Sequence, residues 1–208
     1  MPHPDHAACA DAIASHAREV AALGWMPATS GNFSMRLDHG HAAITASGAH
    51  KGRLTHDDIL AIDLADGRAL DTTRRPSAET LLHVQVYRRF PDAGAVLHTH
   101  SHNQSVASRL FAADGVVSLR GWELQKAIHG FDSHDATLDI PVFPNSQSMP
   151  ELAACVDAWL DAGQALHAYL IDGHGLYAWG RDMREARRHL EALDFMLACE
   201  LDLRRLSS

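Results

Sequence analysis

Apolar residues recur along this chain with two different periods, and each period predicts a different kind of element. From Asp5 to Leu23 they return every three or four positions and Gly24 follows, which predicts a helix and its end. The same spacing of four leucines between residues 190 and 201 predicts a long helix that begins near Asp182. Shorter helices are predicted over residues 76–89, 103–111, 123–128 and 148–160.

Short apolar runs bounded by polar or glycine-containing turns predict the strands. These runs are residues 33–37, 42–45, 59–64, 95–100, 116–119, 140–143, 167–171 and 176–179. Only Asp172-Gly173-His174-Gly175 separates the last two runs, which is typical of a hairpin turn. Strands that alternate irregularly with helices predict an α/β fold, in which helices flank a largely antiparallel central sheet.

Composition places the chain among ordinary globular proteins. Its 208 residues are 46% hydrophobic and 21% charged, so we expect one domain, residues 1–208, that is large enough to bury a core. The formal net charge of −8 and the lack of a basic block argue against nucleic acid as a partner. A small anionic substrate remains compatible, because a local pocket can be cationic on an acidic protein.

The sequence also predicts a cytoplasmic protein that has no membrane partner. No apolar run approaches the roughly 20 residues that span a bilayer, and residues 1–5 lack the pattern of a signal peptide. Cys9, Cys155 and Cys199 are scattered without a CxxC spacing, which favours reduced thiols.

Three histidines form the strongest chemical signal. His98 and His100 are two residues apart at the end of an apolar run, so their side chains leave one face of a strand together. His174 lies in the predicted hairpin turn and is the third candidate. A lone histidine is more often structural, but three on one ion leave a coordination position open, as in a catalytic zinc site. A purely structural zinc site is disfavoured, because no fourth Cys or His has suitable spacing.

Two loops have the composition of an anion-binding cradle. Residues 29–32 and 45–48 combine hydroxyl groups with glycines that let backbone N–H groups face a ligand, and Lys51 and Ser77 can add donors. Neither loop matches a nucleotide-binding motif. Tight-turn chemistry explains each loop about as well.

Two carboxylates are candidates for acid–base chemistry. Glu79 follows Pro76 and Ser77 in the first turn of a predicted helix, where a favourable interaction with the helix dipole is the simpler explanation. Glu123 precedes Lys126 by three residues, so a surface ion pair is the simpler explanation there.

The order of the motifs resembles the class II aldolase/adducin family over residues 17–200. The motifs are Ser30-Gly31-Asn32, Ile44-Thr45-Ala46-Ser47-Gly48, Pro76-Ser77-Ala78-Glu79, His98-Thr99-His100 and Asp172-Gly173-His174-Gly175. The resemblance implies a three-layer α/β/α domain, a Zn²⁺-type ion on the three histidines, and a homotetramer with sites near subunit interfaces. Together with the loop chemistry, it implies phosphate binding by Ser30, Gly31, Asn32, Ser47, Gly48, Lys51 and Ser77.

Two further stretches, residues 24–32 and 121–127, resemble a branch of the family that removes water from a phosphorylated ketose in methionine salvage. In that branch the acid–base residue falls on Glu123, whose pKa we expect Trp122 and Leu124 to raise. Glu79 is the second candidate catalytic residue, supporting the metal ion or the substrate hydroxyls.

Two other functions stay open for this family. A sugar-phosphate aldolase would share the metal ion and the phosphate pocket, but such family members use a tyrosine near the C-terminus, and here no tyrosine follows Tyr177. A non-catalytic interaction module, as in adducin, is disfavoured because all three histidines are present.

Overall fold

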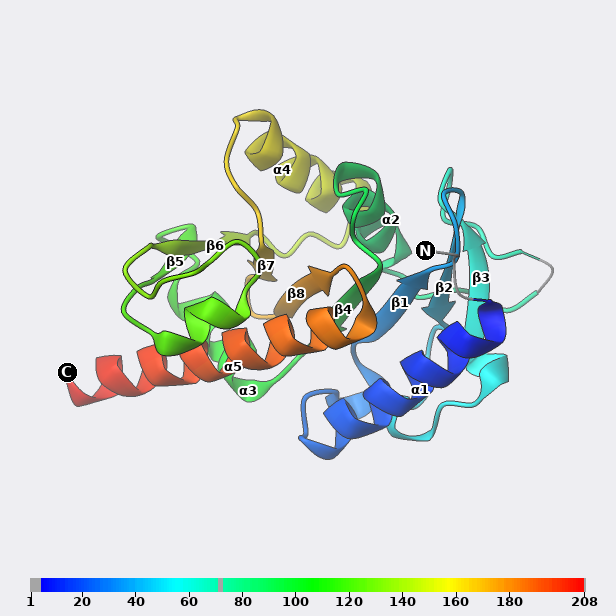
Figure 1. The fold of residues 1–208 in the computed structure, drawn as a ribbon, viewed down its shortest axis with the longest axis horizontal. Coiled ribbons are helices and arrows are strands. Elements are labelled where there is room, and N and C mark those ends of the chain that lie inside the picture. Colours follow the sequence, from blue (N-terminus) through cyan, green and yellow to red (C-terminus); the bar gives the residue numbers. More distant parts are fainter. Residues whose placement is uncertain (1–4, 71–72, 208) are drawn as a thin grey trace.

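The computed structural model describes residues 5–70 and 73–207 and is built around one eight-stranded sheet (Figure 1). The strands are β1 (Asn32–Arg36), β2 (His41–Thr45), β3 (Ile59–Asp63), β4 (Ala95–Thr99), β5 (Val116–Leu119), β6 (Leu138–Phe143), β7 (Ala168–Ile171) and β8 (Gly175–Gly180). Their order across the sheet is β3-β2-β1-β4-β8-β7-β6-β5. Every neighbouring pair is antiparallel except β6 and β7, so the prediction of a largely antiparallel sheet is confirmed.

Helices cover both faces of this sheet. The α-helices are α1 (His6–Ala22), α2 (Thr80–Arg89), α3 (His102–Leu110), α4 (Met149–Asp161) and α5 (Met183–Leu206). One buried core joins the sheet to α1, α3 and α5, and a second joins it to α2 and α4. Figure 1 shows the same division, with α2 and α4 above the sheet and α1 and α5 below it. Two cores on opposite faces make the three-layer α/β/α arrangement that the resemblance implied.

Short 3-10 helices supply the irregular connections. They are η1 (Pro27–Thr29), η2 (Lys51–Arg53), η3 (His56–Asp58) and η4 (Glu123–Ala127). The helix predicted over residues 123–128 forms as η4, a 3-10 helix of five residues with tighter turns than those of an α-helix.

Two ladders at the middle of the sheet position the site. In the β4–β8 ladder Thr99 pairs with Leu176, so the end of β4 meets the turn that precedes β8. In the β1–β4 ladder Asn32 pairs with His98, which brings the start of β1 to the same edge. Among the described residues, no helix is both long and apolar enough to cross a membrane.

Candidate active site and metal centre

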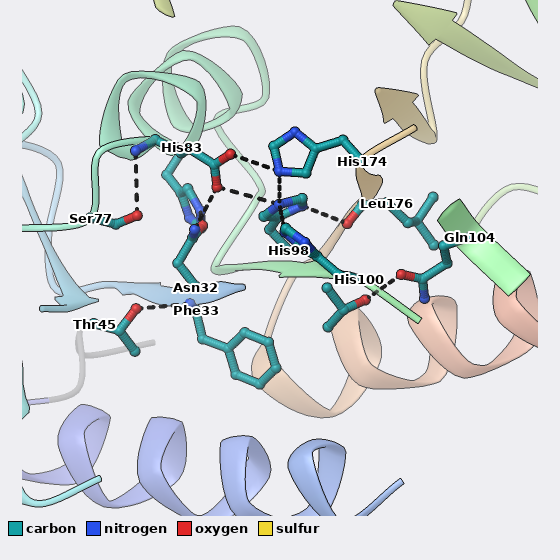
Figure 2. A network of polar contacts seen from close by, with 12 residues as sticks. Asn32, Phe33, Thr45, Ser77, His83, His98, His100, Gln104, His174 and Leu176 are labelled. Atoms are coloured by element: carbon teal, nitrogen blue, oxygen red, sulfur yellow. Dashed lines mark hydrogen bonds and ion pairs between the residues drawn. The ribbon is translucent and has the colours of Figure 1, made fainter. Parts of the chain in front are cut away.

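The three predicted histidines converge. The Nε2 atom of His98 lies 2.8 Å from Nε2 of His100 and 3.3 Å from Nε2 of His174. One ligand atom from each residue lies within 4.8 Å of the other two. Figure 2 shows the three rings facing one another, two from the end of β4 and one from the β7–β8 turn. The sequence prediction that they form one cluster is confirmed.

The protonation of these rings suits a metal ligand. Nδ1–H of His98 donates to the carbonyl oxygen of Leu176 at 3.0 Å, which leaves the Nε2 lone pair free. Burial lowers the pKa of His98 to about 4. Burial, with the neighbouring His98 and His174, lowers the pKa of His100 to about 3. Both imidazoles are therefore neutral near pH 7, the form that binds a cation.

A divalent cation fits between these nitrogens. Tetrahedral ligands about 2.0–2.1 Å from zinc lie about 3.3–3.4 Å apart. The 3.3 Å between His98 and His174 matches this separation, whereas the 2.8 Å between His98 and His100 is shorter, so these two rings would move apart around an ion. The buried Nε2 lone pair of His98 faces two further ring nitrogens. Such a lone pair is unfavourable unless a positively charged group lies between the nitrogens. The donor set of three imidazoles suits Zn²⁺ but also accepts iron, cobalt or nickel.

Glu79 lies against the histidine cluster. Its Oε2 is 3.3 Å from His98 Nε2 and its Oε1 is 3.1 Å from His174 Nε2. Asn32 Nδ2 donates to Oε2 at 2.6 Å. Burial raises the pKa of the Glu79 carboxyl, but His98, His174 and the hydrogen bond from Asn32 outweigh it and hold that pKa below its usual range. The carboxylate therefore adds a negative charge beside the centre.

The predicted loops meet beside Glu79. Ser77 N–H donates to the Thr45 carbonyl at 3.2 Å, which joins the loop before α2 to the loop after β2. Lys51 is buried, and its Nζ donates to the carbonyls of Thr29 and Ala49 at 2.8 Å each. The structure therefore brings together the loops that carry Ser30, Gly31, Ser47, Gly48 and Ser77.

Gly31 allows a close approach of backbone to backbone at this point. Its φ is +74°, and a Cβ atom placed there would lie 2.7 Å from the His98 carbonyl oxygen. Only glycine accepts both conditions without a shift of the chain. The strand that carries His98 can therefore pass close to the loop at Gly31.

Asn32 is engaged differently from the role implied by the resemblance. Its side chain is 4% exposed, with Nδ2 on Glu79 and Oδ1 2.5 Å from His83 Nε2. The resemblance placed Asn32 in the phosphate pocket, but in this structure its amide holds the carboxylate of Glu79.

Glu123 lies apart from the histidine cluster in the single chain. Its carboxylate is exposed, 2.7 Å from Lys126 Nζ and 3.7 Å from His134 Nδ1. The hydrogen bond from Lys126 lowers the pKa of Glu123. The expectation that Trp122 and Leu124 would raise it is therefore wrong for the isolated chain, because the 3-10 turn points the carboxylate to solvent.

Sequence reasoning missed two kinds of supporting residue. Tyr177 pairs with His98 across the sheet and stacks on its ring. Gln104 holds the turn after β4, where its Oε1 accepts from Thr99 Oγ1 at 2.8 Å and its Nε2 donates to Asp194 at 3.0 Å. Strand pairing places Tyr177 against His98, which the local sequence does not reveal. Ser101 and Gln104, in contrast, have the spacing of a capping box, a local signal for the start of α3.

Comparison with known proteins places the chain in a family. The model of the class II aldolase and adducin N-terminal domain matches residues 11–201. The chain therefore belongs to the class II aldolase and adducin family, as its motifs predicted.

The similar proteins within that family include dehydratases. The methylthioribulose-1-phosphate dehydratase of Stenotrophomonas maltophilia K279a is 59% identical over 197 residues, which cover 95% of this chain and 92% of the relative. The protein of the same name from Xanthomonas campestris pv. campestris 8004 is 57% identical over 199 residues, 96% of this chain and 91% of the relative.

Solved structures share the fold at lower identity. An L-fuculose 1-phosphate aldolase superposes with a TM-score of 0.81 at 20% identity and covers 99% of this chain and 90% of its own. The L-fuculose-1-phosphate aldolase of Thermus thermophilus gives a TM-score of 0.75 at 27% identity, with 95% of each chain covered. The first likeness concerns the fold alone.

Proposed function

We propose that this chain is a metal-dependent hydro-lyase that converts 5-methylthioribulose 1-phosphate to 2,3-diketo-5-methylthiopentyl 1-phosphate in methionine salvage. The observation that carries this proposal is the 57–59% identity, over at least 95% of the chain, with methylthioribulose-1-phosphate dehydratases. The histidine cluster agrees with it, since it offers a metal ion three ligands and leaves room for a substrate.

The metal ion, proposed to be Zn²⁺, would be held by His98, His100 and His174. When bound, it supplies Lewis-acid polarisation of the substrate's C2 carbonyl group. Glu79 lies 3.1–3.3 Å from two of these ligands and is ionised, so it can accept hydrogen bonds from substrate hydroxyl groups beside the centre.

Glu123 is proposed as the acid–base residue, acting on the site of a neighbouring subunit. In one chain its carboxylate contacts Lys126 and His134, and no contact with the three histidines is present among the described residues. The family resemblance implies a homotetramer with sites near subunit interfaces. The exposed, apolar Leu124 beside Glu123 fits such an interface.

In the proposed reaction, the carboxylate of Glu123 both removes and returns a proton. Glu123 takes the proton from C3, and the electron pair of that C–H bond forms the C2–C3 double bond of an enediolate. Glu123 then returns a proton to the C4 hydroxyl, the C4–O bond breaks, and water leaves. As water leaves, the C2 carbonyl group re-forms and a C3–C4 double bond appears. This enol then takes up a proton at C4 and loses the proton of its C3 hydroxyl group, which gives the 2,3-diketone without cleavage of a C–C bond.

The loops around Lys51 are proposed to bind the substrate's phosphate. Lys51 uses two of its three N–H donors on carbonyl groups, which leaves one for a phosphate oxygen. The buried hydroxyl of Ser30 has no hydrogen-bond partner within residues 5–70 and 73–207, so a ligand can supply one. Ser47, Gly48 and Ser77 complete this proposed pocket. Fixing the phosphate would present one C–H bond to the base.

A phosphorylated substrate and three cysteines without a disulfide fit an enzyme of the cytoplasm. The decisive test of the reaction is turnover of methylthioribulose 1-phosphate by metal-loaded protein, with identification of the product. One diketone phosphate is expected. Two carbonyl fragments would instead identify a retro-aldol enzyme, and no reaction would refute both.

A further inference from the structure

A chain of buried hydrogen bonds runs from Glu79 into the core. Asn32 Oδ1 lies 2.5 Å from His83 Nε2. His83 Nδ1 lies 2.7 Å from Ser34 Oγ, which in turn lies 2.8 Å from Tyr87 Oη. Figure 2 shows Asn32 beside His83 at the edge of the histidine cluster.

Strand and helix periodicity explain how this chain is built. Asn32 and Ser34 are two residues apart on β1, so both side chains leave the same face of the sheet. Glu79, His83 and Tyr87 are four residues apart along α2 and its N-cap, so they lie on one side of the helix. The side chains from β1 alternate with those from α2, so each polar group on the strand forms hydrogen bonds with polar groups on the helix.

The carboxylate at one end sets the direction of every hydrogen bond. A carboxylate oxygen only accepts, so Asn32 must present Nδ2 to Glu79 and Oδ1 to His83. His83 must then carry its hydrogen on Nε2, and its bare Nδ1 must accept from Ser34. The hydroxyl group of Ser34 has one hydrogen, which it donates to His83. Tyr87 must therefore donate its own hydroxyl hydrogen to Ser34 Oγ.

Every member of this chain beyond Glu79 is buried. Ser34 and His83 are 0% exposed, Tyr87 is 2% exposed and Asn32 is 4% exposed. Burial lowers the pKa of His83 to about 4, so the ring is neutral at physiological pH and can donate at Nε2 while accepting at Nδ1. A charged ring could not accept from Ser34.

We infer that His83 is a positioning residue of the active site, which fixes the amide of Asn32 and, through it, the carboxylate of Glu79 beside His98 and His174. The expected effect of His83 on catalysis rests on the proposed function. The expected position of the hydrogen on His83 and the expected effect of His83 on metal binding do not. A ring that only filled space would serve equally well as phenylalanine, because its edge contact with Tyr177 needs no polar atom.

Three single variants separate positioning from packing. His83→Phe keeps the ring and removes both hydrogen bonds, whereas His83→Gln retains an N–H donor at the Nε2 position. Gln85→Met is the matched control, because Gln85 is buried on the same helix but donates to the Ala153 carbonyl, away from the site.

The first readout is binding of Co²⁺ alone, followed by its d–d absorption. We expect His83→Phe to weaken Co²⁺ binding about 10–100-fold, the range for loss of an outer partner of a metal site, and to change the spectrum. His83→Gln and Gln85→Met should stay within about twofold of the unaltered protein, and in an Asn32→Ala background His83→Phe should have no further effect. Unchanged Co²⁺ binding in His83→Phe, or an equal loss in the Asn32→Ala background, would overturn the inference.

The second readout is the hydrogen position on His83, measured by ¹⁵N NMR of the metal-free protein, which needs no variant to fold. Hydrogen on Nε2 supports the inference, and hydrogen on Nδ1 contradicts it. With methylthioribulose 1-phosphate, kcat should fall in His83→Phe and recover in His83→Gln while KM changes little. If the unaltered protein does not turn over this substrate, the proposed function fails, and the Co²⁺ and NMR results still decide the inference.

Discussion

The ring of His98 stacks on the ring of Tyr177, with 4.1 Å between centroids and 16° between planes. The two residues are partners across the β4–β8 ladder. The stacking fixes the plane of the imidazole, and the hydrogen bond from Nδ1 to the Leu176 carbonyl fixes its tautomer. The Nε2 lone pair is therefore aimed at the centre of the cluster by the sheet itself, as is expected of a preorganised metal ligand.

Replacing His98 with alanine should abolish tight zinc binding. The unaltered protein should gain about 2.7 kcal/mol of stability when free zinc is 100 times its Kd, and His98→Ala should gain none. His102→Ala is the control, because His102 is exposed at the start of α3 and should leave zinc binding unchanged. Elemental analysis and thermal melts with and without zinc measure both effects. Full zinc occupancy in His98→Ala would remove this residue from the site.

Glu123→Gln should leave the fold and the zinc content intact and abolish dehydration. If Glu123 serves a neighbouring subunit, a mixed oligomer of Glu123→Gln and His98→Ala chains should regain activity, because some sites then combine an intact base with intact ligands. The control is an oligomer that carries both changes in every chain. Activity of co-refolded mixtures measures the effect, and mixtures as inactive as the control would show that Glu123 does not act across subunits.

Gly31→Ala should destabilise the protein more than Gly48→Ala. Both glycines have positive φ, +74° and +73°, so each substitution carries a backbone cost of about 1 kcal/mol. At Gly31 the added Cβ would also lie 2.7 Å from the His98 carbonyl, whereas at Gly48 no atom lies within 4 Å. Urea unfolding of the two metal-free variants provides the comparison. Equal losses would show that the backbone at Gly31 relaxes freely.

The stability of the metal-free protein should fall as the pH drops from 6.5 to 4, in part because of His83. Burial lowers the pKa of His83 from 6.5 to about 4, so in this window the unfolded chain binds more protons than the folded one. The contribution is on the order of 3 kcal/mol. His83→Gln has no titrating group there, so its unfolding free energy should fall less over the same window. Parallel curves for the two proteins would contradict the assignment.

The sequence alone predicted the parts of the site that depend on short-range geometry. His98 and His100 share a strand face because strands have a period of two, and the turn that carries His174 follows from the apolar runs on either side of it. The family resemblance then implied that the three histidines bind one ion, because the local sequence does not show that two distant segments lie side by side.

The parts that could not be predicted depend on which elements pack together. The sequence shows that Glu79 and His83 are four residues apart. This spacing lets both side chains form hydrogen bonds with Asn32 only because α2 packs on the face of β1 that carries Asn32. Likewise, the apolar neighbours of Glu123 suggested a buried carboxyl, but a side chain's neighbours in sequence do not enclose it. In this chain Lys126 is its partner instead.

Removal and return of the metal ion test the central claim most directly. Protein stripped of metal by a chelator should not convert methylthioribulose 1-phosphate, and adding back one equivalent of Zn²⁺ per subunit should restore formation of a single diketone phosphate. Full turnover by protein shown by elemental analysis to be free of metal would contradict the account.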